Sequence, residues 1–162
     1  RRAGTETIYN HALTMREKYP DIKIVVMGDM NDSPSDESLS VLLRARKKIS
    51  LVEKDDYFNP FWVLHDEGFG TSIHNHRWNL FDNIIVSPSL LETFPEIPGL
   101  KLVKMNQKHY CEIFKRNFML QKGWPKRSYN GNNFQNGYSD HLPVLIKIDK
   151  MKSNNKKNNE RN

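Results

Sequence analysis

Three short apolar runs in this 162-residue sequence each contain an aspartate or lie within two residues of one. The runs are residues 22–27, 80–86 and 142–148. They are rich in Ile, Val and Leu, which predicts buried β-strands, and we expect the first to be covered on both faces. Because ligand chemistry in α/β folds concentrates at strand ends, the sequence predicts a functional site where these three strands meet.

The polar residues at these strand ends are of the types that phosphodiester hydrolysis requires. They are Asp29, Asn31, Asp82, Asp140 and His141. A divalent metal held by carboxylates neutralises phosphate charge and can activate water. A carboxylate beside an imidazole orients the ring and favours its cationic form. We therefore predict a metal and phosphate site; an Asx turn after the first strand is the alternative interpretation of Asp29 and Asn31.

Length and composition predict one domain followed by a basic tail. A chain of this length supports one sizeable core but not two. Residues 150–162 are dominated by Lys and Asn and contain almost no apolar side chains. Such a segment buries too little apolar surface to offset the entropy of ordering it. We expect a folded unit over residues 1–149 and disorder over residues 150–162.

Charge and cysteine content limit the partners. The formal net charge is +6 and the pI is about 9.4, which favours polyanionic partners, although a solvated basic surface is the alternative. The single cysteine, Cys111, excludes an internal disulfide framework and a cysteine-based zinc site. We expect no transmembrane segment, since no run approaches the roughly 20 apolar residues of a membrane helix. Secreted, periplasmic and cytoplasmic locations all stay open.

Apolar spacing and turn residues predict the remaining elements. In chain order they are an amphipathic helix over residues 5–19, a short helix from residue 36 with a basic last turn at 44–48, a helix after residues 59–60, a hairpin with strands 71–73 and 80–86, a strand at 102–103, a helix over 110–120 and a loop over 121–137.

The polar motifs come in the order and rough spacing of the endonuclease/exonuclease/phosphatase superfamily. They are residues 28–32 (GDMND), 81–87 (FDNIIVS) and 138–144 (YSDHLPV). Each motif alone is weak, but the three together, each on an expected strand end, resemble this superfamily strongly. The resemblance implies a deoxyribonuclease I-like α/β fold, a four-layer α/β sandwich of two mostly antiparallel sheets with helices outside.

The resemblance also implies a role for each polar residue. Asp29 would orient or deprotonate the attacking water, and Asn31 would position that water and the phosphate. Asp82 would hydrogen-bond His141, which would stabilise the developing charge. Asp140 would bind Mg²⁺ or Mn²⁺. Losing one such preorganised group typically costs ~10²–10³ in rate.

The resemblance covers only the C-terminal half of the family's domain. The N-terminal half of that domain supplies an Asn and a Glu for the metal and a Tyr or His near the phosphate, and these have no counterpart here. We therefore expect one sheet with flanking helices, whose apolar face lacks the missing N-terminal half as its partner and favours aggregation. We also expect little or no activity from residues 1–162 alone.

The expected function is metal-dependent phosphodiester hydrolysis of the endonuclease type. A sphingomyelinase- or phosphatase-type activity of the same family is the alternative within this chemistry. A non-catalytic relative that binds polyanions is the alternative of another class.

Nucleic acid is the favoured substrate, because the loop before Ser139 interleaves basic and aromatic side chains. From this loop, Trp124, Lys126 and Arg127 are candidates for substrate contacts, and Arg2 is a further candidate near the start of the chain. A solvated loop that packs Trp124 inward is the alternative interpretation.

Overall fold

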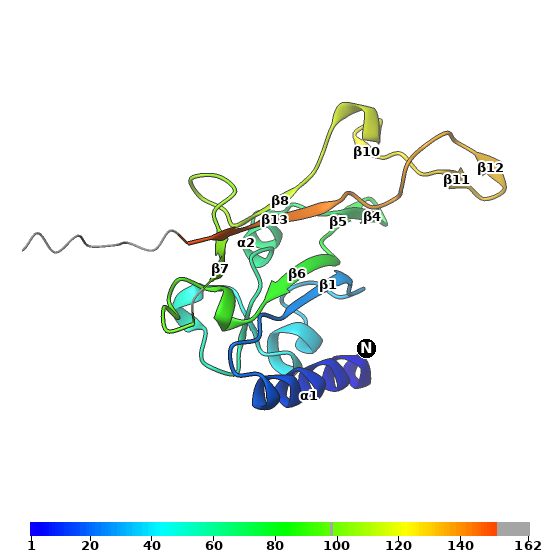
Figure 1. The fold of residues 1–162 in the computed structure, drawn as a ribbon. Coiled ribbons are helices and arrows are strands. Elements are labelled where there is room, and N and C mark those ends of the chain that lie inside the picture. Colours follow the sequence, from blue (N-terminus) through cyan, green and yellow to red (C-terminus); the bar gives the residue numbers. More distant parts are fainter. Residues whose placement is uncertain (98, 152–162) are drawn as a thin grey trace, which may run out of the picture.

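The computed structural model describes residues 1–97 and 99–151, which form a mixed α/β structure with several small sheets and few helices (Figure 1). The helices are α1 (Arg2–Lys18) and α2 (Trp62–Asp66), and the short helical turns are η1 (Ser38–Leu42), η2 (Ile49–Leu51), η3 (Pro88–Leu90) and η4 (Asn117–Met119). The strands are β1 (Val25–Asp29), β2 (Ala45–Arg46), β3 (Tyr57–Phe58), β4 (Ser72–His74), β5 (Arg77–Asn79), β6 (Asp82–Val86), β7 (Leu100–Val103), β8 (Cys111–Ile113), β9 (Leu120–Gln121), β10 (Trp124–Pro125), β11 (Tyr129–Asn130), β12 (Asn133–Phe134) and β13 (Val144–Lys150).

The largest sheet among the described residues has four strands in the order β1-β6-β3-β2. Strands β1 and β6 are antiparallel and pair over their whole length. Helix α1 lies along one side of this sheet (Figure 1), and its Ala12 is buried with Leu39, Leu43 and Ile85. The expected helix over residues 5–19 is thus confirmed, with an earlier start at Arg2.

A three-stranded sheet in the order β7-β13-β8 contains the last strand of the described chain. The first half of β13 pairs with β8, and its second half pairs with β7. Cys111 and Ile146 from this sheet pack with Ile84 of β6 and with Leu80 just before it, so one apolar cluster joins the two sheets. The expected strand at 102–103 is confirmed as part of β7.

Strand β1 is covered on one face only, which corrects the expectation of a strand buried on both faces. It is the edge of its sheet, and only the side of Val26 faces the core under α1. On the opposite side, Val25 is 39% and Met27 is 70% exposed. The near-continuous apolar run does not distinguish a fully buried strand from an edge strand with one open face.

The helix expected over residues 110–120 is wrong. Residues Cys111–Ile113 form strand β8, and only Asn117–Met119 make a helical turn. Pairing with β13 sets Ile113 opposite Val144. This long-range ladder overrides the local helical pattern, since it satisfies the backbone and buries Cys111 at the same time.

The hairpin expected over residues 71–87 has a different returning strand. Strand β4 pairs with β5, so that His74 lies opposite Arg77. The two turn residues, Asn75 and His76, both have positive φ, as a two-residue type I′ hairpin turn requires. This short turn fixes the register, and β6 is left to pair with β1 instead.

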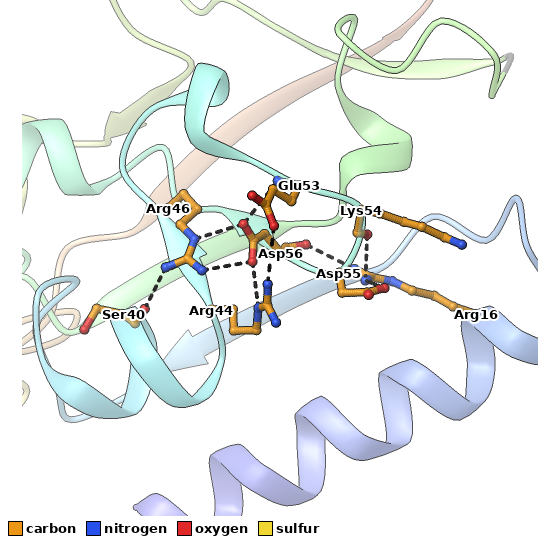
Figure 2. A network of polar contacts seen from close by, with 8 residues as sticks. All are labelled: Arg16, Ser40, Arg44, Arg46, Glu53, Lys54, Asp55 and Asp56. Carbon is orange, nitrogen blue, oxygen red and sulfur yellow. Dashed lines mark hydrogen bonds and ion pairs between the residues drawn. The ribbon is translucent and has the colours of Figure 1, made fainter.

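The short helix expected from residue 36 ends at Leu42, before the basic residues that were expected to form its last turn. Arg44 has a φ of 60°, which reverses the chain into β2. Arg44 and Arg46 then donate hydrogen bonds to the buried carboxylate of Asp56, at distances of 2.7 to 3.0 Å (Figure 2). The tertiary structure brings Asp56 next to Arg44 and Arg46, so these arginines bind a carboxylate instead of forming the last turn of a helix.

Two further expectations have clear outcomes. The helix after residues 59–60 is confirmed as α2, with Phe61 and Leu64 buried at its start and middle. The expected loop over residues 121–137 contains two small hairpins, β9–β10 and β11–β12. Of the expected tail, residues 152–162 lie outside the described residues.

Candidate active site

The register of β1 and β6 brings the first two candidate carboxylates together. Asp29 lies directly opposite Asp82, and paired residues of an antiparallel ladder project their side chains from the same face. The backbone N–H of Met30 continues the contact, because it donates to the carbonyl of Phe81 at 2.8 Å. Gly28 precedes this point with a φ of 145°, a conformation that residues with a Cβ rarely adopt.

His141 reaches the same place from the start of the last strand. Leu142 donates its N–H to the carbonyl of Thr71 at 2.8 Å, and a β-bridge joins Ser72 to His141. These backbone contacts hold the imidazole beside β6, where His141 Nδ1 lies 2.7 Å from Asp82 Oδ2. The expected Asp82–His141 contact is therefore present in the structure.

The hydrogen bonds of Asp82 indicate which ring nitrogen of His141 carries a proton. An ionised carboxylate can only accept hydrogen bonds, so Nδ1 of His141 carries the proton in this contact. The hydroxyl of the buried Thr71 donates to the same oxygen, Oδ2. The ring is fixed at Nδ1, which leaves Nε2 for a substrate. Thr71 was missed by the sequence reasoning, because a threonine in a strand carries no signal of this role.

Asp29 and Asn31 form an Asx turn at the end of β1. The N–H of Asn31 donates to Asp29 Oδ1 at 2.9 Å, and Asn31 itself has a φ of 51°. Both residues are exposed, so the second carboxylate oxygen and the side-chain amide are open to a ligand. The turn that was the alternative interpretation is present, and it fixes the orientation of the Asp29 carboxylate without blocking it.

Two buried amide side chains support the strand that carries Asp82. Asn83 donates to the carbonyl of Phe81 at 3.1 Å and accepts from Asn59 at 2.9 Å. Asn59 in turn accepts from the N–H of Phe61 at 3.0 Å. Buried polar groups are costly unless they are bonded, so this chain of bonds specifies one position for residues 81–83. The sequence reasoning assigned Asn59 only to the start of a helix.

Asp140 lines a groove whose lining residues do not include Asp29, Asn31, Asp82 or His141. The groove has a volume of about 690 Å³ and is also lined by His76, Trp124 and Arg127. Trp124 is 44% exposed, so it does not pack inward as the alternative interpretation required. A larger cavity of about 820 Å³, between α1 and η3, contains none of the candidate residues.

The remaining substrate candidates lie elsewhere or are partly engaged. Arg2 donates to Glu37 at 2.6 Å in an exposed ion pair. The backbone of Lys126 is held by Met119 and Tyr138. These contacts place Lys126 at the base of the loop that contains Trp124 and Arg127.

The described residues alone do not complete a metal centre. Within residues 1–97 and 99–151, no three His, Cys, Asp or Glu side chains are grouped so that they could hold a metal ion. Asp140 is an oxygen donor of the kind that Mg²⁺ and Mn²⁺ prefer, but one such carboxylate is not a site. We therefore derive no reaction step through a metal.

Cys111 takes no part in this site. Burial, assisted by the charge of Glu67, raises the pKa of its thiol to about 12. The thiol donates to the carbonyl of Pro60 at 3.0 Å. A thiol with so high a pKa is not a nucleophile at neutral pH.

Asp29 and Asp82 lie opposite each other at adjoining strand ends, and His141 contacts Asp82. A family model described as the endonuclease/exonuclease/phosphatase family matches residues 1–150, and the chain belongs to this family. Its members are generally hydrolases of phosphoester bonds that use divalent metal ions. Comparisons with curated proteins and with solved structures gave no match. Within the described residues, no helix is long and apolar enough to cross a membrane.

Proposed function

We propose that this protein is a metal-dependent phosphodiester hydrolase of the endonuclease type. The observation that carries the proposal is the 2.7 Å contact between Asp82 Oδ2 and His141 Nδ1, with Asp29 on the facing strand position. The Asp82 carboxylate accepts from Nδ1 of His141, which leaves Nε2 of the ring to face the substrate phosphate.

The residues have separate tasks in the proposed reaction. His141, held at Nδ1, donates its Nε2–H to a phosphate oxygen and so stabilises the charge that develops there. Asp29 orients the attacking water and accepts its proton. Asn31 holds the water or the phosphate through its neutral amide. Phosphate charge neutralisation of this kind is typical of phosphoryl transfer, where positioning and electrostatics supply most of the rate.

Asp140 is the proposed ligand of Mg²⁺ or Mn²⁺. The ion would supply charge neutralisation at the phosphate when it is bound. Because the described residues offer no group of three ligands, we expect residues 1–162 alone to bind the ion weakly and to turn over slowly. The exposed Val25 and Met27 on β1 support the further proposal that this half belongs to a four-layer sandwich.

Nucleic acid is the proposed substrate. Trp124 and Arg127 line the groove that contains Asp140, and Lys126 lies in the same segment. Arg2 is kept as a further contact, for which the exposed pair with Glu37 would have to open. Sphingomyelin or phosphorylated small molecules are the alternative substrates, and a non-catalytic polyanion-binding protein is the alternative of another class.

The decisive experiment compares substrates with the protein as its gene encodes it. Plasmid DNA, sphingomyelin, phosphoinositides and the chromogenic diester bis(4-nitrophenyl) phosphate are each incubated with Mg²⁺, with Mn²⁺ and with EDTA. We expect diester hydrolysis that EDTA abolishes, and a loss of ~10²–10³ in kcat for His141→Ala.

His11→Ala is the matched control, because His11 is an exposed histidine of α1. Its activity should equal that of the wild type. Absence of hydrolysis from every substrate would leave only the polyanion-binding alternative, and an unchanged rate for His141→Ala would overturn the assigned role of His141.

A further inference from the structure

An extended segment of the chain, residues 117–138, projects beside the candidate active site. Figure 1 shows β10, β11 and β12 on this extension, which leads away from β8 and returns to β13. We call residues 117–138 the arm. The arm contains three basic side chains, Lys122, Lys126 and Arg127, and no Asp or Glu. The charge of its first half, residues 117–127, therefore suits a polyanion.

Backbone hydrogen bonds give the arm a defined shape. Tyr138 donates its N–H to the carbonyl of Lys126 at 3.0 Å, and Gln135 donates to Ser128 at 2.8 Å. Beyond these bonds the two sides continue as the β11–β12 hairpin. At the base, a Cβ on Gly137 would lie only 2.1 Å from the carbonyl oxygen of Arg127, so glycine is required there. The arm is thus a preformed ribbon.

The arm carries most of the exposed aromatic side chains. Among the described residues, seven large aromatic side chains are markedly exposed, and five of them belong to the arm. These five are Phe118, Trp124, Tyr129, Phe134 and Tyr138. They form a series of ring pairs, since Phe118 packs on Tyr138 and Tyr129 packs on Phe134 with ring centroids 5.5 and 5.3 Å apart. Their remaining faces are free to stack on planar ligands.

The series of rings reaches the groove that Asp140 lines. The ring centroids of Trp124 and His76 lie 5.3 Å apart. Both residues line the groove that Arg127 and Asp140 also line. Asp140 directly precedes His141, whose imidazole is the proposed phosphate contact. A polymer that follows the arm therefore arrives at Asp140, the residue directly before His141.

The polar composition of the arm distinguishes between two kinds of polyanion. The arm carries seven Asn or Gln side chains, and its only Leu, Ile, Val or Met residues are Met119 and Leu120, neither of which is exposed. Burying these amides in the acyl region of a membrane would cost free energy for each unbonded group. Base edges and phosphates, in contrast, offer hydrogen bonds to the amides. Exposed rings also require unpaired bases, because paired bases are already stacked on their neighbours.

We propose that the arm binds single-stranded nucleic acid and directs it to the candidate active site. Bases stack on the exposed rings, beginning at Trp124, while Lys122, Lys126 and Arg127 contact the phosphates. The binding part of this inference stands on the arm alone; the delivery of a scissile phosphate to His141 rests on the proposed function.

Binding is tested without catalysis, on the full chain in EDTA. Fluorescence anisotropy compares a labelled single strand of about 12 nucleotides with a duplex of the same length at about 50 mM NaCl. Vesicles of phosphatidylserine and phosphatidylcholine are the third ligand compared. We expect the single strand to bind tightest and Trp124→Ala to weaken it by about tenfold, the loss of one stacked base.

Phe69→Ala is the matched control, since Phe69 is a 55% exposed aromatic residue outside the arm. It should leave single-strand binding unchanged. Tighter binding of the duplex, binding of vesicles in preference to the single strand, or an equal effect of Trp124→Ala and Phe69→Ala would each overturn the proposal.

Hydrolysis of bis(4-nitrophenyl) phosphate separates this proposal from the proposed function. Single-strand binding without any diester hydrolysis would contradict the proposed hydrolase function and support the arm as a nucleic-acid binding site. Diester hydrolysis with no effect of Trp124→Ala on single-strand binding would support the hydrolase function and contradict nucleic-acid binding by the arm.

Discussion

Asp82 connects the residues of the candidate active site more than any other side chain does. Its Oδ2 accepts from both His141 and Thr71, and its backbone lies opposite Asp29. Each of these contacts comes from a different part of the chain. The geometry of the imidazole therefore depends on a residue, Thr71, that has no chemistry of its own.

Thr71 gives the first prediction at this scale. Thr71→Val keeps the shape of the side chain but removes the hydroxyl that donates to Asp82. A hydrogen bond to a charged group contributes about 1.5–3 kcal/mol, so we expect kcat to fall by about 10- to 100-fold with KM nearly unchanged. Thr71→Ser, which retains the donor, should remain near wild type. Steady-state kinetics on the chromogenic diester measures both; equal rates for the two variants would contradict the assigned role.

Cys111 gives a second prediction at the residue scale. Because burial raises the pKa of its thiol to about 12, the thiolate is scarce at pH near 8. We expect the native protein to react with 5,5′-dithiobis(2-nitrobenzoate) at least about 10²-fold more slowly than the denatured protein. Equally fast labelling of the native chain would show that β8 opens readily or that Cys111 is not buried.

At the scale of elements, a buried lysine holds the turn after β6 against β7. Lys101 is only 3% exposed, and its Nζ donates to the carbonyls of Ser89, Leu91 and Phe94 at 2.8 to 3.1 Å. Burial, together with the charge of Lys23, lowers the pKa of this lysine. The ammonium thus donates to three carbonyls of the turn η3 and the chain after it, of which those of Leu91 and Phe94 also accept backbone N–H groups from Phe94 and Ile97.

The third prediction concerns this lysine. Lys101→Met preserves the length of the side chain and removes the buried ammonium that donates to all three carbonyls. We expect the free energy of unfolding to fall by about 2–4 kcal/mol. Lys104→Met, at an exposed position of the same segment, should change it by less than about 0.5 kcal/mol. Urea denaturation followed by circular dichroism measures both, and similar values for the two variants would contradict the role of Lys101.

At the scale of the whole molecule, Asp56 and three arginines, Arg16, Arg44 and Arg46, form a polar cluster (Figure 2). This cluster joins the chain before β3 to both α1 and β2. Arg16 of α1 donates to the backbone carbonyl of Asp56, and Arg44 and Arg46 bind its carboxylate. Burial by itself raises the pKa of Asp56, but the hydrogen bonds from Arg46 and Arg44 outweigh it and lower the pKa below the ordinary value. The folded state therefore prefers the ionised carboxylate more strongly than the unfolded state does.

The fourth prediction is the pH dependence that follows. A lowered pKa in the folded state contributes stability that is present above the unfolded pKa of about 3.9 and is lost as the pH falls through the folded value. Asp56→Asn should cost about 1–3 kcal/mol at pH near 7 and should flatten the loss of stability in acid. Asp55→Asn, at a 52% exposed side chain, should behave as the wild type. Thermal melts between pH about 3 and 7 test this; parallel profiles for wild type and Asp56→Asn would contradict it.

Much of the site was predictable because it depends on local chemistry. The motifs around Asp29, Asp82 and His141 mark strand ends, and a polar residue after an apolar run shows as such in any single sequence. Helix α1 and strand β7 were predictable for the same reason, since periodicity is a local property. The family and its phosphoester chemistry follow from these motifs.

Tertiary structure decided the rest, because long-range pairing is not a local property. Pairing with β13 makes Cys111–Ile113 a strand where a helix was expected. The β4–β5 hairpin leaves β6 to pair with β1 in a different sheet. Thr71, Asn59 and Asn83 acquired their roles only when distant segments met at Asp82. The sequence by itself determined which groups can do chemistry; the fold determined which of them touch, since contact requires a path of backbone bonds that no short motif encodes.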